Sequence, residues 1–221
     1  MKIPLIPAGS LIVSCQAPVD SPLHNPVVIA AMAQAAVNQG AVGVRIDTPT
    51  HIQAVREQLT QPIIGLWKRQ IPGCEVYITP RFEDAKAVAE AGADIIAIDA
   101  TQRLHPEGET TGHLIQRIRQ ELEKPVMADV DTLTAALEAA KAGADIVGTT
   151  LYGYTAATQY SQPPGFGLLH QMVKELKVPI ICEGGIATPE QAREAFDLGA
   201  NAIVVGTAIT GIDALAKRFI F

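Results

Sequence analysis

The 221-residue sequence lacks the features that would mark a nucleic-acid-binding, secreted or membrane protein. It has no cluster of basic residues and its formal net charge is −6, which argues against nucleic acid as a partner. No run of 18 apolar residues is present, and no long apolar segment follows the single lysine near the N-terminus. We therefore expect a cytoplasmic protein that binds neither nucleic acid nor a membrane.

Cysteine is also scarce, which argues against disulfide bonds and zinc sites. The three cysteines, Cys15, Cys74 and Cys182, lie far apart in the sequence and form no C-x-x-C motif. Such a pattern is typical of reduced thiols in a cytoplasmic protein. No group of His, Asp and Glu residues has the spacing of metal ligands, so we expect no metal site.

The sequence does contain a repeated pattern in which a helix, a glycine and an apolar strand follow one another. Four predicted helices end at Gly40, Gly92, Gly143 and Gly199, and an alanine-containing turn then leads into a β-branched apolar run. Glycine suits the left-handed position that ends helices. The successive glycines lie 52, 51 and 56 residues apart, which leaves room for two strand–helix units in each interval.

Eight apolar runs are predicted to form strands. They span residues 11–16, 41–47, 62–68, 94–99, 125–130, 145–150, 179–183 and 202–206. Helical patterns lie between them, including residues 81–91, 132–142 and 188–198. Eight strands that alternate with helices predict a (β/α)8 TIM barrel, formed by a single domain over residues 1–221. A doubly wound open sheet is the alternative, but its G-x-G-x-x-G fingerprint is absent.

The barrel prediction places the active site at the carboxyl ends of the strands, where two glycine turns follow the last two strands. These turns contain Gly184 and Gly185, and Gly206 and Thr207. Backbone N–H groups in such turns can bind a phosphate. The alternative is that these glycines only permit tight turns. We predict that the four residues form a phosphate site.

Two ionisable residues at strand ends are candidates for proton transfer. Lys68 follows the apolar run IIGLW and suits a general base or a Schiff-base nucleophile, although lysines at strand ends also simply extend into solvent. Glu183 ends the run PIICE. A carboxylate is favourable near the N-terminus of a following helix, but next to a phosphate site it would repel the ligand. We therefore predict catalytic roles for both residues.

Other polar residues at strand ends suit recognition of a substrate's hydroxyl or carbonyl groups. Arg45 and Asp129 have such positions, and the alternative is that each forms half of an ion pair across the barrel mouth. Gln16 and Asp99 are weaker candidates on this argument alone. Tyr154, in the loop after the sixth strand, suits either a sugar site or packing within the loop.

Short motifs along nearly the whole chain resemble those of the N-acetylmannosamine-6-phosphate 2-epimerases of sialic acid catabolism. They include SCQA, GVRI, GLWKR, YITP, IIAIDAT, MADV, LYGYT, CEGGI and VVGTAIT. GLWKR and LYGYT are specific to the resemblance, whereas the glycine turns alone fit many phosphate-binding barrels. The family commonly has an arginine directly after AIT, where this chain has Gly211. Here either backbone groups and another cation bind the phosphate, or phosphate affinity is lower.

The resemblance implies an N-acylglucosamine-6-phosphate 2-epimerase, an isomerase that needs no cofactor and acts on a small sugar phosphate. It implies that Lys68 and Glu183 transfer protons and that Gln16, Arg45 and Asp129 hold the sugar. The chemistry agrees, because the C2 hydrogen becomes acidic when the ring opens and C1 is an aldehyde. Inversion through an enediolate then needs a proton-transfer group on each face of C2.

Two other functions remain open at this point. Lys68 could form a Schiff base in a phosphosugar lyase or synthase. The chain could also be a non-catalytic phosphosugar sensor, which would not need a lysine facing a glutamate. The oligomeric state is open as well, and a homodimer is one of the options.

Overall fold

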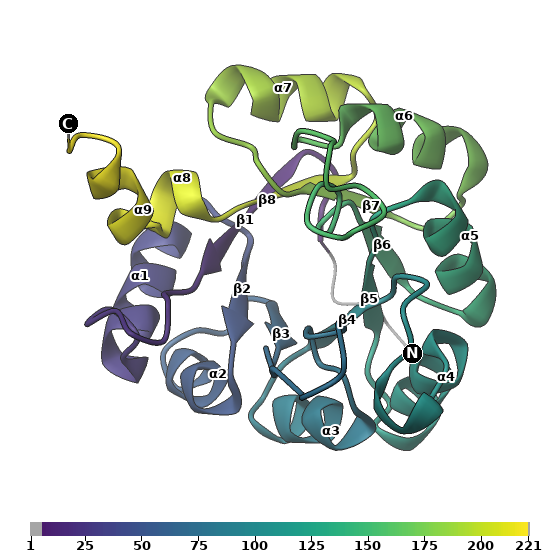
Figure 1. The fold of residues 1–221 in the computed structure, drawn as a ribbon. Coiled ribbons are helices and arrows are strands. Elements are labelled where there is room, and N and C mark those ends of the chain that lie inside the picture. Colours follow the sequence, from purple (N-terminus) through teal and green to yellow (C-terminus); the bar gives the residue numbers. More distant parts are fainter. Residues whose placement is uncertain (1–5, 221) are drawn as a thin grey trace.

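The computed structural model describes residues 6–220, which form a closed barrel of eight parallel strands (Figure 1). The strands are β1 (Ser10–Cys15), β2 (Gly43–Asp47), β3 (Ile63–Leu66), β4 (Ile95–Asp99), β5 (Val126–Asp129), β6 (Ile146–Gly148), β7 (Ile180–Glu183) and β8 (Ala202–Val205). Each strand pairs with its neighbours in the sequence, and β8 closes the barrel against β1. The predicted TIM barrel is confirmed, and the open sheet is excluded.

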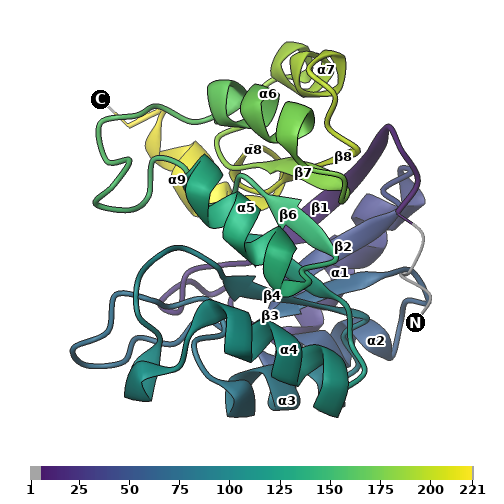
Figure 2. The ribbon, with the colours of Figure 1, turned by 90° about the vertical axis from the view of Figure 1, so that its right-hand side faces the viewer.

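Helices surround the barrel on the outside (Figures 1 and 2). They are α1 (Pro26–Asn38), α2 (Pro49–Arg56), α3 (Phe82–Glu90), α4 (Thr111–Glu121), α5 (Leu133–Ala142), α6 (Phe166–Glu175), α7 (Pro189–Asp197), α8 (Thr207–Thr210) and α9 (Ile212–Lys217), with a short 3-10 turn η1 (Pro106–Gly108) before α4. None of the described helices is long and apolar enough to cross a membrane.

The local signals read from the sequence explain where these helices begin and end. The four glycines predicted to end helices, at positions 40, 92, 143 and 199, all have left-handed backbone with φ between 100° and 105°. At the start of α7, the Thr188 side chain accepts a hydrogen bond from the Gln191 N–H, and Pro189 takes the first helical position.

Alternating side chains of the strands form two apolar layers. One layer fills the barrel and includes Ile12, Leu66 and Met127. The other packs between the strands and the helices, and includes Ile29 and Cys182. Successive residues of a strand point to opposite faces, so Cys182 faces the helices while Glu183 faces the barrel mouth.

Two strands, β3 and β6, differ most from the prediction, since each is three residues shorter, and both end where side chains turn toward the barrel mouth. The run predicted over 62–68 leaves the sheet after Leu66, and Lys68 forms an isolated antiparallel bridge with Ile78. The run predicted over 145–150 ends at Gly148. The loops after β3 and β6 extend to the same end of the molecule, where α9 also lies (Figure 2).

Candidate active site

A cavity of about 970 Å³ opens at the carboxyl ends of the strands. Polar side chains reach it from several directions around the barrel. They are Ser14 and Gln16 at β1, Arg45 on β2, Lys68 after β3, Thr150 after β6 and Glu183 on β7. Because these strands stand all around the barrel, their end residues meet at its centre. The cavity therefore combines residues from distant parts of the chain, from Ser14 to Arg218.

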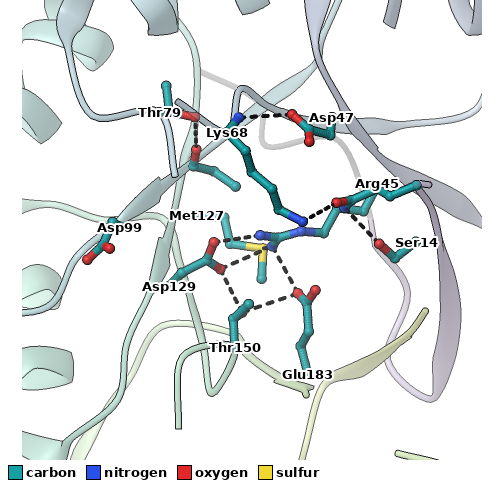
Figure 3. A network of polar contacts seen from close by, with 12 residues as sticks. Ser14, Arg45, Asp47, Lys68, Thr79, Asp99, Met127, Asp129, Thr150 and Glu183 are labelled. Carbon is teal, nitrogen blue, oxygen red and sulfur yellow. Dashed lines mark hydrogen bonds and ion pairs between the residues drawn. The ribbon is translucent and has the colours of Figure 1, made fainter. Parts of the chain in front are cut away.

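Arg45 is the centre of a buried ionic network in this cavity (Figure 3). Its guanidinium group donates to both carboxylate oxygens of Asp129, at 3.0 and 2.6 Å, and to Glu183 Oε2 at 2.9 Å. Arg45 is 1% exposed, Asp129 0% and Glu183 9%. Thr150 Oγ1 donates to Asp129 Oδ1 at 2.7 Å and lies 3.2 Å from Glu183 Oε2. The ion pair considered from the sequence is thus present, and it includes Glu183.

The network sets the ionisation of both partners. Burial works against the charge of Arg45, but Asp129 and Glu183 outweigh this effect and raise the Arg45 pKa. Burial raises the pKa of Glu183 to about 7, although the charge of Arg45 opposes the shift, and Asp129 adds to it. Glu183 can therefore gain or lose a proton near neutral pH, as a general acid or base must.

Lys68 enters the same cavity from the side opposite Glu183, because β3 and β7 lie four strands apart in the closed barrel. Its Nζ donates to Gln16 Oε1 at 2.6 Å, and Gln16 Nε2 donates to Ser14 Oγ at 2.9 Å. The Lys68 side chain is exposed at the cavity, and desolvation by the protein atoms around it lowers the Lys68 pKa even though Asp47 opposes the shift. Figure 3 shows Lys68 and Glu183 approaching the guanidinium of Arg45 from opposite sides.

The glycine turns after β7 and β8 line the same cavity. Gly184 and Gly185 have φ of 100° and 74°. Within residues 6–220, the backbone N–H groups of Gly184, Gly185, Thr207 and Ala208 donate to no other residue. They are thus available to bind an anion, as the sequence prediction for the two turns requires.

Gly185 has no room for a side chain. If this turn served only as a phosphate site, a valine at position 185 would crowd the phosphate oxygens alone. In the structure, a Cβ atom at Gly185 would instead lie 2.4 Å from the Cβ of Pro163. A side chain there would collide with the loop before α6, so the variant would disturb the fold and cannot report on phosphate binding alone.

Other polar residues lie around or outside the cavity. Tyr154 lines it and is 57% exposed. Asp99 lies apart from the network and accepts from Arg103 Nη2 at 2.6 Å, so its charge has a structural partner. His105 is buried against Pro80, while His113 contacts Glu109 on the surface. No described group of three or more His, Cys, Asp or Glu side chains is placed to share a metal ion.

Among the cavity residues that were not predicted as site residues, two bear on the chemistry of the network. Thr150 connects the two carboxylates of the network, and Tyr77 lines the cavity from the loop after β3. Burial raises the pKa of Tyr77 to about 12, and Asp129 and Asp99 contribute, so its hydroxyl keeps its proton and can donate to a ligand. Thr150 could have been predicted as a site residue from the sequence, because it stands at the end of a predicted strand.

The chain is similar to proteins of one family along most of its length. The family model described as "Putative N-acetylmannosamine-6-phosphate epimerase" matches residues 29–221. A Synechococcus elongatus protein described as "Putative N-acetylmannosamine-6-phosphate 2-epimerase" is 60% identical over 96% of this chain and 92% of that protein. A Listeria welshimeri protein with the same description is 45% identical over 96% and 91%. The structure of the N-acetylmannosamine-6-phosphate 2-epimerase from Clostridium perfringens superposes with a TM-score of 0.92 at 42% identity, over 96% of this chain and 92% of that one.

Proposed function

The chain belongs to the N-acetylmannosamine-6-phosphate epimerase family, and on that premise we propose that it inverts C2 of N-acetylmannosamine 6-phosphate to give N-acetylglucosamine 6-phosphate. The activity is that of an N-acylglucosamine-6-phosphate 2-epimerase, carried by one domain over residues 1–221. The observation that carries the proposal is the opposed placement of Lys68 and Glu183 in one cavity.

Lys68 and Glu183 are the proton-transfer pair of this mechanism. After the sugar ring opens, one of them removes the C2 proton of the aldehyde form, and an enediolate results. The other then delivers a proton to the opposite face of C2. The pKa of Glu183 is raised to about 7 and that of Lys68 is lowered from its ordinary value, so the two pKa values move toward each other, as a pair that exchanges protons with one carbon requires.

Arg45 stabilises the negative charge that develops on the enediolate. Its guanidinium lies between the Lys68 and Glu183 side chains and is fixed by Asp129, so it needs no reorganisation during the reaction (Figure 3). Gln16, which accepts from Lys68, and Tyr154 line the cavity and are in position to bind sugar groups. Asp129 is fully buried and outside the cavity lining, so it contributes to the sugar site by orienting Arg45. No metal or cofactor is needed for this chemistry, because the aldehyde itself activates the C2 hydrogen.

The phosphate of the substrate binds to the turns that contain Gly184, Gly185, Gly206 and Thr207. The unused N–H groups of Gly184, Gly185 and Thr207 support this assignment. Glu183 and Gly184 are adjacent in the chain, so a phosphate held by the turn places the rest of the sugar close to the Glu183 carboxyl group.

A proton NMR time course in D2O tests the proposal. With N-acetylmannosamine 6-phosphate as substrate, we expect the epimer to form with deuterium at C2. Lys68→Ala and Glu183→Gln should each lower kcat by about 10²- to 10⁴-fold. We also expect one of the two variants to retain deuterium exchange into unreacted substrate, since the remaining group still faces the C2 proton of one epimer.

Lys86→Ala and Glu90→Gln serve as matched controls, because both residues lie on the outer helix α3 and their side chains are 57% and 67% exposed. These variants should keep wild-type activity. Near-normal epimerisation by Glu183→Gln would remove Glu183 from the mechanism, because an amide does not shuttle a proton at neutral pH.

The lowered pKa of Lys68 also suits a Schiff-base mechanism, which is the second candidate function. Borohydride added with the sugar phosphate would trap a covalent adduct on Lys68 in a lyase or synthase. We expect no adduct with the epimerase. A sugar-phosphate sensor, in contrast, would bind the ligand without deuterium uptake at C2.

We further propose that the enzyme is cytoplasmic and forms a homodimer. The three cysteines are free thiols, and Cys15 and Cys182 are buried, which fits a reducing compartment. Exposed apolar side chains near the C-terminus, at Ile212, Phe219 and Ile220, fit a subunit contact. Cell fractionation and light scattering after size-exclusion chromatography test these two statements.

A further inference from the structure

The cavity needs a cation at its phosphate end, and the catalytic network does not supply one. The full cations among the residues that line the cavity are Arg45, Lys68 and Arg218. Arg45 is engaged by Asp129 and Glu183, and Lys68 extends toward Gln16 at the catalytic end. A sugar phosphate carries close to two negative charges at neutral pH, and backbone N–H groups alone leave them without a counter-charge.

Arg218 is the remaining cation, and the part of the chain that the structure describes places no carboxylate within ion-pair distance of it. Asp213, which also lines the cavity, accepts at 3.2 and 3.0 Å from the Ser21 hydroxyl and is thereby directed to the loop after β1. The Arg218 side chain is exposed. A guanidinium in this state is free to bind an incoming phosphate with two parallel hydrogen bonds.

Gly211 cannot itself supply the cation, and Arg218 lies seven residues beyond it. A Cβ atom at Gly211 would lie 2.8 Å from both the Cα and the carbonyl oxygen of Thr207, so the turn between α8 and α9 has no room for a side chain. Beyond this turn, Gly211, Ala214 and Arg218 all line the cavity. Their spacing of three and four residues places Ala214 of α9 and the two residues that flank this helix on one side, toward the cavity that the glycine turns also line.

We propose that Arg218 binds the substrate phosphate together with the turns after β7 and β8. The cation thus comes from the far end of α9, since position 211 cannot carry a side chain in this conformation. The proposal rests on the proposed function, in which the substrate is a sugar phosphate. It makes Arg218 a binding residue that determines the preference for phosphorylated over unphosphorylated sugar.

Arg218→Ala tests the proposal, with Lys217→Ala as the matched control. Lys217 is the neighbouring exposed cation of α9 and does not line the cavity. We expect Arg218→Ala to raise KM for N-acetylmannosamine 6-phosphate by about 10- to 100-fold, with little change in kcat. The reason is that the lost charge-assisted contact is made equally in the ground state and in the transition state. Arg218→Lys should recover part of this loss.

A binding measurement separates this proposal from the proposed function. Trp67 is the single tryptophan of the chain and lines the cavity, so its fluorescence can follow binding of inorganic phosphate without any turnover. Arg218→Ala should weaken phosphate binding by about the same 10- to 100-fold, whereas Lys217→Ala should not. Equal affinities of the two variants would overturn the role of Arg218. Absence of epimerisation by the wild-type enzyme, with the phosphate result intact, would overturn only the proposed reaction.

Discussion

Asp129→Asn is expected to shift the pH dependence of the enzyme toward acid. Asp129 and Glu183 bind the same Nη1 atom of Arg45, at 3.0 and 2.9 Å, so the bonded oxygens of these two carboxylates are close together. Their mutual repulsion is one of the causes that raise the pKa of Glu183 to about 7. The asparagine removes the negative charge and keeps nearly the same shape. The pKa of Glu183 should therefore fall.

The size of this shift follows from the geometry. Two unit charges separated by about 6 Å interact by about 3 kcal/mol at an effective dielectric constant of about 20, which corresponds to about 2 pH units. Solvent that enters the open cavity reduces the interaction, so we expect a shift of about 1–2 pH units. Arg45 keeps its contact with Glu183 in this variant and loses its ion pair with Asp129. Its positive charge then acts mainly on Glu183, which lowers the Glu183 pKa further.

The assay is the pH profile of kcat/KM, measured by NMR from both epimers. The acid limb reports the lower of the two pKa values of the proton-transfer pair, whichever group acts as base. We expect its midpoint near pH 7 in the wild-type enzyme and at lower pH in Asp129→Asn, independently of any loss in overall rate. Thr150→Val serves as a control for which the opposite pH shift is expected. It removes the hydroxyl group that lowers the Glu183 pKa, so its midpoint should move to higher pH.

An unchanged or raised midpoint in Asp129→Asn would refute the reasoning. It would mean that the acid limb does not report Glu183, or that the carboxylates do not share Arg45 in solution. A shift of both variants in the same direction would have the same meaning, because the two substitutions act on Glu183 with opposite sign.

Three further predictions concern stability and metal dependence. The pKa of Glu183 is raised to about 7 in the folded state. Between the ordinary pKa of a glutamate and pH 7, the folded protein therefore binds more protons than the unfolded protein. The free energy of unfolding should fall as pH rises through this range, because Glu183 ionises. Glu183→Gln should remove this contribution, and urea unfolding at pH 5 and pH 8 checks it. Cys182→Ala should cost about 1–2 kcal/mol of stability but little activity, and rapid inactivation by a mild thiol reagent, prevented by substrate, would contradict this. Treatment with a chelator should leave activity unchanged, whereas loss of activity that a divalent cation restores would show a metal requirement.

The barrel could be predicted from the sequence because its signals are local. A glycine after each of four helices and a β-branched run after each glycine identify strand–helix units without any knowledge of distant contacts. The ends of the strands were less predictable. Trp67 and Thr149 continue the apolar or β-branched pattern, but pairing stops before them, since the chain there turns toward the cavity. Local preference for extended structure does not report whether a partner strand is present.

The candidate site was predictable in position and less so in its contacts. The sequence places Arg45 and Asp129 at strand ends, but whether they pair or bind a ligand depends on distances across the barrel. The structure places them in contact, with Glu183 as a second acceptor. The packing role of Gly185 could not be predicted from the sequence either. Its lack of a side chain leaves room for Pro163, which lies 22 positions earlier in a loop without a recognisable pattern.

The charges of the network are suited to a reaction that runs in both directions. Arg45 and Asp129 form a bidentate ion pair, and Lys68 and Glu183 are the proposed proton-transfer groups beside it. Desolvation lowers the pKa of Lys68 and raises that of Glu183, so it brings the two pKa values toward each other. The cluster has the same net charge in two protonation states. In the first, Lys68 carries a proton and Glu183 is ionised. In the second, Glu183 carries the proton and Lys68 is neutral. An epimerase needs both states, because each turnover in one direction converts the first into the second. The fixed Arg45–Asp129 pair is therefore as important for the proposed activity as the two groups that transfer protons.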